Sequence, residues 1–323
     1  MKTLIVVSGG DAPGINATVA GYAAIAARNG DTVLGAKDGF AGALTNQIQP
    51  IERRVVGLLS GRGGSYLASS REPVLGAPDA DKQLRAILSE NEVDNLLLFG
   101  GDGTLSHVLP LLHDWRIPAI ALPTTIDNDV PGTDLTLGHD SACNYAYQAI
   151  DGVLATAHAL PGRIFMVETL GGDTGHLAQA VAYGAGAQVV LVPEYPEPLE
   201  WVGVRLNQVL ATDGYALVVL SEGVKTIPGM AEAIPRMTGT RLRYTSLGHA
   251  QRGGNVSHRD RALAMEMGQL AHQGFADGIE MGSVVVLEGK TLLHAGPSGG
   301  DAKAPPDRKR YDFINGKESV NGG

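Results

Sequence analysis

Four short stretches of this sequence carry residues whose types and spacing could perform chemistry. They are residues 8–16 (SGGDAPGIN), 100–104 (GGDGT), 123–129 (PTTIDND) and 247–254 (LGHAQRGG). The first two follow apolar runs, and their glycines allow main-chain amides to approach a phosphate at the start of a helix. The third stretch holds two carboxylates, and the fourth holds a His and an Arg between glycines. Phosphoryl transfer to an alcohol requires this combination of phosphate donors, metal ligand and base.

The GGDGT stretch suits a magnesium-bound phosphate. Asp102 stands alone between glycines, and a single carboxylate is a ligand that Mg²⁺ takes beside phosphate oxygens. We expect Thr104 to cap the helix that follows. Capping alone is the alternative for this stretch, and a tight structural turn is the alternative for residues 8–16. The latter stretch is neither the GxGxxG fingerprint nor a GxxxxGK[ST] P-loop.

The PTTIDND stretch places two carboxylates, Asp127 and Asp129, at a spacing of two in a loop expected after a strand. One can accept a hydroxyl proton while the other organises a metal or the loop itself. A generic Asp-rich turn is the alternative interpretation.

The LGHAQRGG stretch, with Arg243 just upstream, predicts a phosphate-binding site. Arg252 offers a planar fork of donors, and His249 stands three residues before it. Arg71, Arg163 and Glu222 could complete such a site, Glu222 because it follows an apolar run and could accept bonds from sugar hydroxyls. Taken singly, each of these three residues is better explained as a surface charge or as a packing ion pair.

The elements that position these residues are short apolar runs followed by glycine-rich turns and helical stretches. The runs are residues 4–7, 96–99, 119–122, 164–167, 189–192, 216–220 and, as the last clear strand, 284–287. Continuous apolar runs indicate strands covered on both faces, and their alternation with helices indicates parallel sheets. Ligands bind at the carboxyl ends of such strands, where the chemical residues lie. The sequence therefore predicts an α/β fold.

Composition narrows the class of protein. The chain has 323 residues, near two domains, with 44% hydrophobic and 18% charged residues, which excludes wholesale disorder. A net charge of −9 argues against nucleic acid or a membrane surface as partner. Neither a transmembrane run nor a signal-peptide core is recognisable. The single cysteine, Cys143, excludes an intrachain disulfide, and we expect a cytoplasmic protein.

Taken together and in this order, GGDAPGIN, GGDGT, TIDND and LGHAQRGG resemble the phosphofructokinase family, and the resemblance covers roughly residues 3–296. It implies phosphorylation of fructose 6-phosphate at the 1-hydroxyl by Mg-ATP, giving fructose 1,6-bisphosphate in glycolysis. It also implies two Rossmann-like lobes with mostly parallel sheets and the active site in the cleft between them. Residues 1–138 with 252–305 would form the larger, nucleotide-binding lobe, and residues 139–251 with 306–323 the smaller, sugar-phosphate-binding lobe.

The resemblance implies roles residue by residue. Asp127 is similar to the catalytic base, Thr125 and Asp129 to its supporting residues, Asp102 to the Mg²⁺ ligand, and Arg71 to an arginine on the transferred phosphate. The implied ATP site comprises Gly9, Gly10, Phe40, Arg71, Gly101, Asp102, Gly103 and Thr104. The implied sugar-phosphate site comprises Thr125, Asp127, Arg163, Leu170, Gly171, Gly172, Glu222, Arg243, His249 and Arg252. In the family Arg163 and Arg243 reach across from a neighbouring subunit, which implies a homo-oligomer, at least a dimer and commonly a homotetramer.

Three positions depart from the family pattern or decide between its members. Gly103 favours ATP, because pyrophosphate-using members place Asp there and Lys where Thr124 stands. Gly172 stands where an Arg near the reacting phosphates is usual. Pyrophosphate as donor, another sugar phosphate as acceptor, or a non-catalytic regulatory subunit therefore remain alternatives.

Two further stretches bear on regulation and on the end of the chain. Residues 17–27 and 210–215 match those that line the family's allosteric site, yet they contain no Lys or Arg, so we expect no ADP or phosphoenolpyruvate switch. Residues 307–310 are expected to be a solvated surface stretch. Tyr311 and Phe313 could pack on the second lobe.

Overall fold

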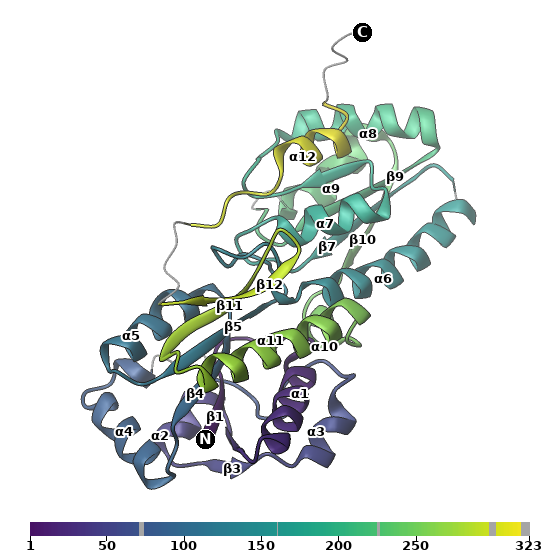
Figure 1. Ribbon diagram of the computed structural model, residues 1–323. Helices are drawn as coiled ribbons and strands as arrows, with labels where there is room; N and C mark the ends of the chain where they lie inside the picture. The colour runs from purple at the N-terminus through teal and green to yellow at the C-terminus, as the bar shows by residue number, and fades with distance from the viewer. Residues whose placement is uncertain (71–73, 160, 225–226, 297–301, 318–323) are drawn as a thin grey trace. The chain divides into compact units, whose positions relative to one another are not determined.

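The structure is a computed structural model that describes residues 1–70, 74–159, 161–224, 227–296, 302–317 (Figure 1). The chain divides into two compact units. Unit 1 comprises Met1–Ser141 and Arg252–Lys303, and unit 2 comprises Ala142–Gln251 and Ala304–Gly323.

Unit 1 is built on one eight-stranded sheet in the order β12-β11-β5-β4-β1-β2-β3, with β6 paired to β5. Its strands are β1 (Lys2–Val7), β2 (Thr32–Ala36), β3 (Ile48–Pro50), β4 (Asn95–Gly100), β5 (Ala119–Thr125), β6 (Leu137–Gly138), β11 (Met281–Leu287) and β12 (Lys290–Ala295). The central strands run parallel, whereas β2–β3 and β11–β12 are antiparallel pairs at the two edges.

Helices cover both faces of this sheet. They are α1 (Ile15–Arg28), α2 (Gly39–Leu44), α3 (Arg53–Leu59), the 3₁₀ turn η1 (Val74–Gly76), α4 (Ala80–Glu90), the π-helical turn η2 (Thr104–Val108), α5 (Leu109–Asp114) and α11 (His258–Ala276). Successive side chains of a strand point to opposite faces. Accordingly Ile5 and Val7 pack into a core with residues of α1 and α11, while Leu4 and Val6 pack into a core with residues of α2 and α4. Burial of both faces explains the unbroken apolar runs of these strands.

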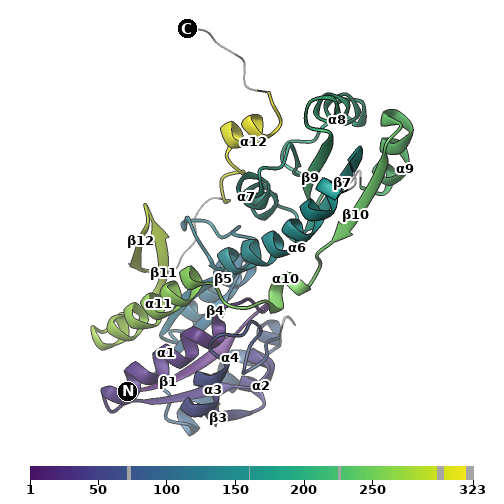
Figure 2. The same cartoon turned by 90° about the vertical axis from the view of Figure 1, so that its right-hand side faces the viewer.

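Unit 2 is built on a four-stranded parallel sheet in the order β10-β7-β9-β8. Its strands are β7 (Arg163–Thr169), β8 (Val189–Leu191), β9 (Tyr215–Ser221) and β10 (Arg241–Ser246), and its helices are α7 (His176–Ala185), α8 (Leu199–Asp213), α9 (Ile227–Thr238) and α12 (Arg308–Ile314). Figure 2 shows α12 beside α7. Helix α6 (His139–Ala159) and the short α10 (Ala250–Gly253) each carry the chain from one unit to the other.

Five strands of the structure, β2, β3, β6, β10 and β12, were not predicted from the sequence. The prediction ended the strands at residues 284–287, but β12 follows and forms a hairpin with β11. The prediction also missed β10, which pairs with β7 in parallel register. Both are edge strands with several exposed or half-exposed residues, so they lack the continuous apolar run on which the prediction relied.

The segment before the C-terminus folds onto unit 2. Asp307 caps α12 by accepting hydrogen bonds from the amides of Lys309 and Arg310. Tyr311 is fully buried and donates its hydroxyl proton to Glu197 at 2.7 Å, whereas Phe313 remains 59% exposed. Residues 307–310 are exposed, as expected, and they also form the N-cap and the first turn of α12.

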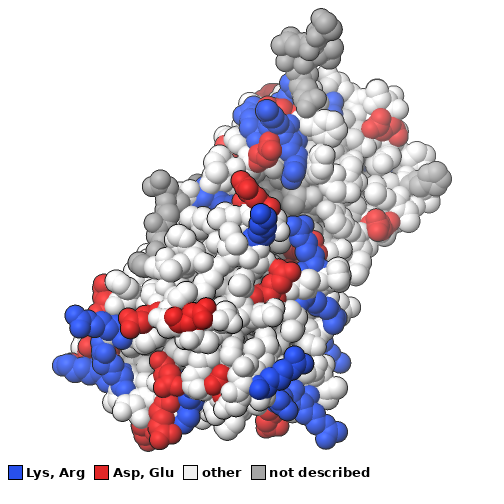
Figure 3. Space-filling model, in the orientation of Figure 1, with Lys and Arg blue, Asp and Glu red and all other residues white. Residues whose placement is uncertain are grey.

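Acidic and basic side chains are interspersed over the face of unit 1 that Figure 3 shows. Among the helices that the structure describes, none is both long and apolar enough to cross a membrane.

Candidate active site

Three of the predicted stretches meet at one edge of the unit 1 sheet. Strands β1, β4 and β5 are parallel neighbours, and their carboxyl ends lead into residues 8–14, 101–103 and 126–129 (Figure 1). This edge is where open parallel sheets bind ligands. The topology thus gathers glycine-rich turns and three carboxylates, Asp102, Asp127 and Asp129, on one side of one sheet.

The first turn is held by residues 69 and 70. The amide of Gly9 donates to the carbonyl of Ser70 at 2.9 Å, and the Ser69 hydroxyl donates to the carbonyl of Gly9 at 2.9 Å. Gly9 has a φ of +89° and Gly14, at the N-cap of α1, a φ of +109°, both disfavoured for other residues. No side chain caps α1 among the described residues, which leaves its first amides available to an anion.

The second turn is joined to the first by Thr104. The Thr104 hydroxyl lies 3.4 Å from the carbonyl oxygen and 3.3 Å from the hydroxyl of Ser8, and the side chain is 5% exposed. The expected helix cap is therefore wrong, because the hydroxyl turns toward the end of β1 instead. A Cβ on Gly100 would stand 2.3 Å from Thr104, so only glycine permits this approach.

The third stretch begins inside β5. Thr124 and Thr125 are the last residues of the strand rather than part of the loop expected after it. The Thr125 hydroxyl accepts a hydrogen bond from the amide of Asp127 at 3.1 Å, and its carbonyl accepts one from the Thr136 hydroxyl at 2.7 Å. Thr125 therefore fixes the backbone on which the candidate base stands.

Asn128 and His139 complete this support, and sequence reasoning missed both. Asn128 has a φ of +54°, and its side-chain oxygen accepts from the amide of Thr136 at 2.9 Å. Nδ1 of the buried His139 lies 2.8 Å from the carbonyl oxygen of Ile126, next to Asp127. Burial lowers the pKa of His139, so the ring is neutral at pH 7 and Nδ1 donates to the carbonyl. The sequence signals that could have pointed to these residues were the Asn inside the PTTIDND stretch and the His ten residues after the end of that stretch.

Asp129 lies in an electrostatically unfavourable place. Burial, followed by the nearby charges of Asp127 and Asp102, raises the pKa of Asp129 from 3.8 to about 6, against the opposing effect of Lys303. Oδ1 of Asp129 is buried and has no hydrogen-bond partner among the described residues. This excess of negative charge suits a divalent cation.

The residues present fit Mg²⁺ bound together with phosphates. No group of three or more His, Cys, Asp or Glu in the described part of the chain could hold a metal by itself. Mg²⁺ binds through one or two carboxylates, waters and substrate phosphates, and Asp102 is a partly exposed carboxylate beside glycine turns. The Ser106 hydroxyl lies 2.6 Å from the carbonyl oxygen of Asp102 and 2.9 Å from its Oδ1.

Unit 2 repeats the arrangement with the sugar-phosphate candidates. Strands β10, β7 and β9 are parallel neighbours, and their carboxyl ends lead into residues 247–250, 170–172 and Glu222. Oε1 of Glu222 accepts hydrogen bonds from the amides of Gly171 and Gly172 at 3.2 and 2.9 Å. His249 is exposed.

Gln251, which sequence reasoning gave no role, connects these turns. Its side chain is fully buried, and its Oε1 accepts from the amide of Leu170 at 2.8 Å. The sequence signal that could have pointed to Gln251 was its place between His249 and Arg252. Arg252 belongs to unit 1, where it donates to the carbonyl of Asp11 at 3.2 Å, and its buried Nε has no hydrogen-bond partner among the described residues.

Arg163 and Arg243 share a pocket of about 510 Å³ formed by β7, β10 and α6. Register explains their meeting, because Arg243 pairs with Phe165, two residues from Arg163, and residues two apart share a face of a strand. Both arginines therefore point to the same open surface.

Three predicted positions are less favourable or fall outside the description. Phe40 is only 2% exposed and packs in the core with Leu4 and Val6, so burial argues against its stacking on an adenine. Leu170 is 6% exposed and contributes little side-chain surface. Arg71 lies outside the described residues.

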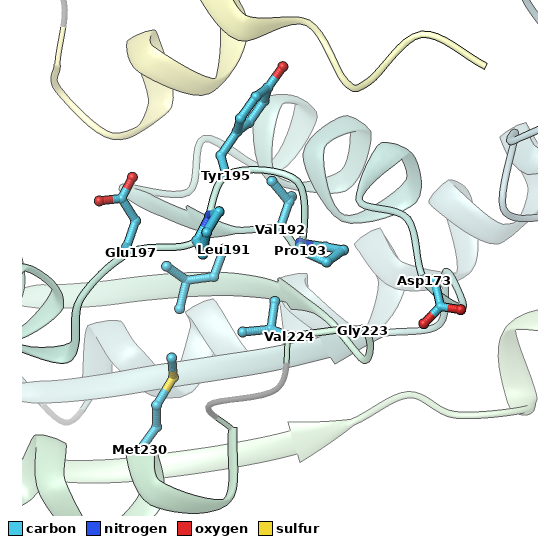
Figure 4. A pocket seen from close by; sticks show the side chains of 10 residues that line it. Asp173, Leu191, Val192, Pro193, Tyr195, Glu197, Gly223, Val224 and Met230 are labelled. Atoms are coloured by element: carbon cyan, nitrogen blue, oxygen red, sulfur yellow. The ribbon is translucent and has the colours of Figure 1, made fainter. Parts of the chain in front are cut away.

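A separate pocket of about 470 Å³ lies at the carboxyl ends of β8 and β9 in unit 2 (Figure 4). Leu191, Val224 and Met230 line its apolar part, with the carboxylates of Glu197 and Asp173 on opposite sides. Glu197 is already bonded to the Tyr311 hydroxyl and to Lys317. The Glu197 carboxylate in this pocket is thus already bonded within the protein. The pocket includes none of the predicted sugar-phosphate residues.

The fold and the turns at its strand ends define an α/β protein with candidate phosphate-binding turns in unit 1 and a cluster of polar groups at the corresponding strand ends in unit 2. A family model, phosphofructokinase, matches residues 2–275. The chain belongs to the phosphofructokinase family.

Named relatives agree. The ATP-dependent 6-phosphofructokinase of Tolumonas auensis is 36% identical over 296 residues, which cover 91% of this chain and 91% of the relative. That of Aquifex aeolicus is 32% identical over 315 residues, covering 96% and 98%.

Solved structures share the fold. Phosphofructokinase from Saccharomyces cerevisiae superposes with a TM-score of 0.83 at 25% identity, over 91% of this chain, which spans only 44% of the yeast chain. The pyrophosphate-dependent phosphofructokinase from Marinobacter aquaeolei gives a TM-score of 0.82 at 21% identity, over 98% of this chain and 91% of that chain, a likeness of fold. The prediction of a two-sheet α/β fold of this family is confirmed.

Proposed function

We propose that this chain is an ATP-dependent 6-phosphofructokinase. It transfers the γ-phosphoryl group of Mg-ATP to the 1-hydroxyl of fructose 6-phosphate and yields fructose 1,6-bisphosphate, a step of glycolysis in the cytoplasm. The observation that carries the proposal is the meeting of the glycine turns with Asp102, Asp127 and Asp129 at the carboxyl edge of β1, β4 and β5. The names of the curated relatives support the same donor and acceptor.

In this proposal Asp127 is the general base. It accepts the proton of the sugar hydroxyl as the oxygen attacks the γ-phosphorus in line and the bond to the β-phosphate oxygen breaks. Thr125 and His139 hold its backbone. Positioning and charge neutralisation together would supply most of the catalysis. Asp102 would hold Mg²⁺, which when bound neutralises phosphate charge. The glycine turns at residues 9–10 and 101–103, with the start of α1, would bind the phosphates of ATP.

Glu222, His249 and Arg252 are the residues that we propose for binding the sugar phosphate. Glu222 would accept from a sugar hydroxyl through the oxygen that Gly171 and Gly172 leave available. His249 and Arg252 would bind the 6-phosphate, and the buried Nε of Arg252 is a donor still in need of an acceptor. Arg163 and Arg243, which share one open surface, would bind the 6-phosphate of the sugar held by a neighbouring copy of the chain. The enzyme would then be at least a dimer, and we propose a homotetramer.

ATP is preferred as the donor because of Gly103. This residue is exposed, and no described atom lies within 4 Å of the place where a Cβ would stand, so the turn leaves room for an α-phosphate. Thr124 and Gly172 are the observations in favour of the alternative, a pyrophosphate-dependent or different sugar-phosphate kinase of the same fold. A non-catalytic regulatory subunit is the third candidate, motivated by Gly172.

Initial rates with fructose 6-phosphate and Mg²⁺, comparing ATP with pyrophosphate, test the proposal. We expect turnover with ATP and at least about 100-fold lower kcat/KM with pyrophosphate. Turnover with pyrophosphate alone would overturn the donor assignment and leave the sugar site intact. Absence of turnover with either donor, in a protein that binds neither ATP nor fructose 6-phosphate, would overturn the proposed reaction.

A further inference from the structure

Lys303, the last residue of unit 1, reaches back to the loop that follows the candidate base. Its Nζ donates to the carbonyl oxygen of Thr133 at 2.5 Å, and the side chain is partly buried. The residue lies beyond residues 2–275, to which the family model corresponds. None of the sequence motifs includes it.

Lys303 contacts a part of this loop that other hydrogen bonds hold in place. The Thr133 hydroxyl accepts from the amide of Val286 in β11 at 2.9 Å and lies 2.9 Å from the carbonyl oxygen of Leu135, to which it can donate. The carbonyl of the next residue, Asp134, accepts from Asn128 at 3.1 Å. The ammonium group therefore attaches residue 303 to the segment that closes back onto the TIDND stretch.

The charge of Lys303 acts on the same loop. Its ammonium lowers the pKa of Asp129, and Asp134 and Asp129 oppose the fall that burial causes in the pKa of Lys303. It also lowers the pKa of His139, which holds the carbonyl beside Asp127. Lys303 is thus a partly buried cation whose charge acts on Asp129, Asp134 and His139.

We propose that Lys303 is a positioning residue of the phosphoryl-transfer site: its ammonium holds the Thr133 carbonyl and balances the charge of Asp129, so that the loop presents Asp127 to the sugar hydroxyl. This role rests on the proposed function, in which Asp127 is the base. In this role Lys303 acts through the loop that it holds and transfers no proton.

Kinetics of three variants test the proposal. We expect Lys303→Met to lower kcat about 10-fold or more with the KM for ATP and fructose 6-phosphate changed less than about 3-fold, because the loop, not the substrate, loses its contact. Lys303→Arg should restore kcat to within about 3-fold of the wild type, since Arg keeps the charge and a donor. Lys290→Met, at an exposed lysine of β12, is the matched control and should leave kcat unchanged. A kcat of Lys303→Met within 2-fold of the wild type, or Lys303→Arg as impaired as Lys303→Met, would overturn the proposal.

A melting experiment tests the same residue without activity. In a double-mutant cycle the loss in Tm caused by Lys303→Met should be smaller by at least about 2 °C in an Asp129→Asn background than in the wild type. Additive changes within about 0.5 °C would show that the two charges do not interact and would overturn the proposal. If the wild-type enzyme shows no kinase activity, the proposed function fails, and the cycle still decides whether Lys303 and Asp129 are coupled.

Discussion

Oε1 of Glu222 accepts a hydrogen bond from the main-chain amide of Gly172 at 2.9 Å, so a carboxylate at the end of β9 anchors the turn after β7. Gly172 has a φ of +57°, in the left-handed region. No described atom lies within 4 Å of the position of a Cβ, so a side chain has room but a strained backbone. The turn is shaped for glycine, and its charged partner comes from another strand.

Gly172→Arg should therefore change stability and substrate binding in opposite directions. We expect a loss of about 1 kcal/mol in the free energy of unfolding, from the left-handed φ, and a lower KM for fructose 6-phosphate from the added cation. Urea unfolding and initial rates measure the two effects. Gly172→Asn is the control, because Asn tolerates this φ better and adds no charge. A KM for Gly172→Arg equal to that of Gly172→Asn would contradict the electrostatic part.

Gly103→Asp should remove the use of ATP without unfolding the protein. The residue is exposed, its φ of −58° suits any side chain, and a Cβ would meet no described atom within 4 Å. We expect kcat/KM for ATP to fall at least about 100-fold, because a carboxylate would repel and displace the α-phosphate. The Tm should remain within about 2 °C of the wild type. Gly103→Ala is the control, and an equal loss of ATP use in both variants would contradict the charge argument.

Asp129→Asn should stabilise the protein in a pH-dependent way. Because the pKa of Asp129 is raised from 3.8 to about 6, the folded state retains a proton that the unfolded state loses. The contribution of Asp129 to the free energy of unfolding is complete below about pH 4, falls as the pH rises through 6 and is absent above it. The difference is at most about 3 kcal/mol.

The substitution Asp129→Asn removes this dependence of stability on pH, because a side-chain amide does not titrate. In urea unfolding without Mg²⁺, Asp129→Asn should gain stability over the wild type at pH 8 and little at pH 4. Asp134→Asn, at an exposed carboxylate of the same loop, is the control. An equal gain at both pH values would contradict the assignment of the titration to Asp129.

Sequence reasoning predicted the α/β fold and the turns that meet at the sheet edges because continuous apolar strands and glycines between strand and helix leave strong local patterns. It missed β2, β3, β6, β10 and β12, because these strands are short or have partly exposed residues that resemble loops. It placed the Thr104 hydroxyl at a helix cap, whereas a contact with Ser8, 96 residues away in sequence, takes it. Local propensity carries no information on such a distant partner.

The support of the candidate base illustrates the same limit. Asp127 and Asp129 follow from a motif, but His139, Asn128 and Lys303 act through tertiary contacts with Ile126, Thr136 and Thr133. Phe40 shows the reverse case: its position in the sequence suggested a ligand contact, yet packing between β1 and α2 places it in the core. Residue type alone does not distinguish these outcomes.

The measurement that tests the account most directly is the turnover of Asp127→Ser with Mg-ATP and fructose 6-phosphate, beside the equilibrium binding of the sugar phosphate. Loss of the base should lower kcat by about 10³-fold, while the Kd for fructose 6-phosphate stays within about 3-fold, because Glu222, His249 and Arg252 are untouched. A kcat within 10-fold of the wild type would remove Asp127 from the role of base and contradict the account.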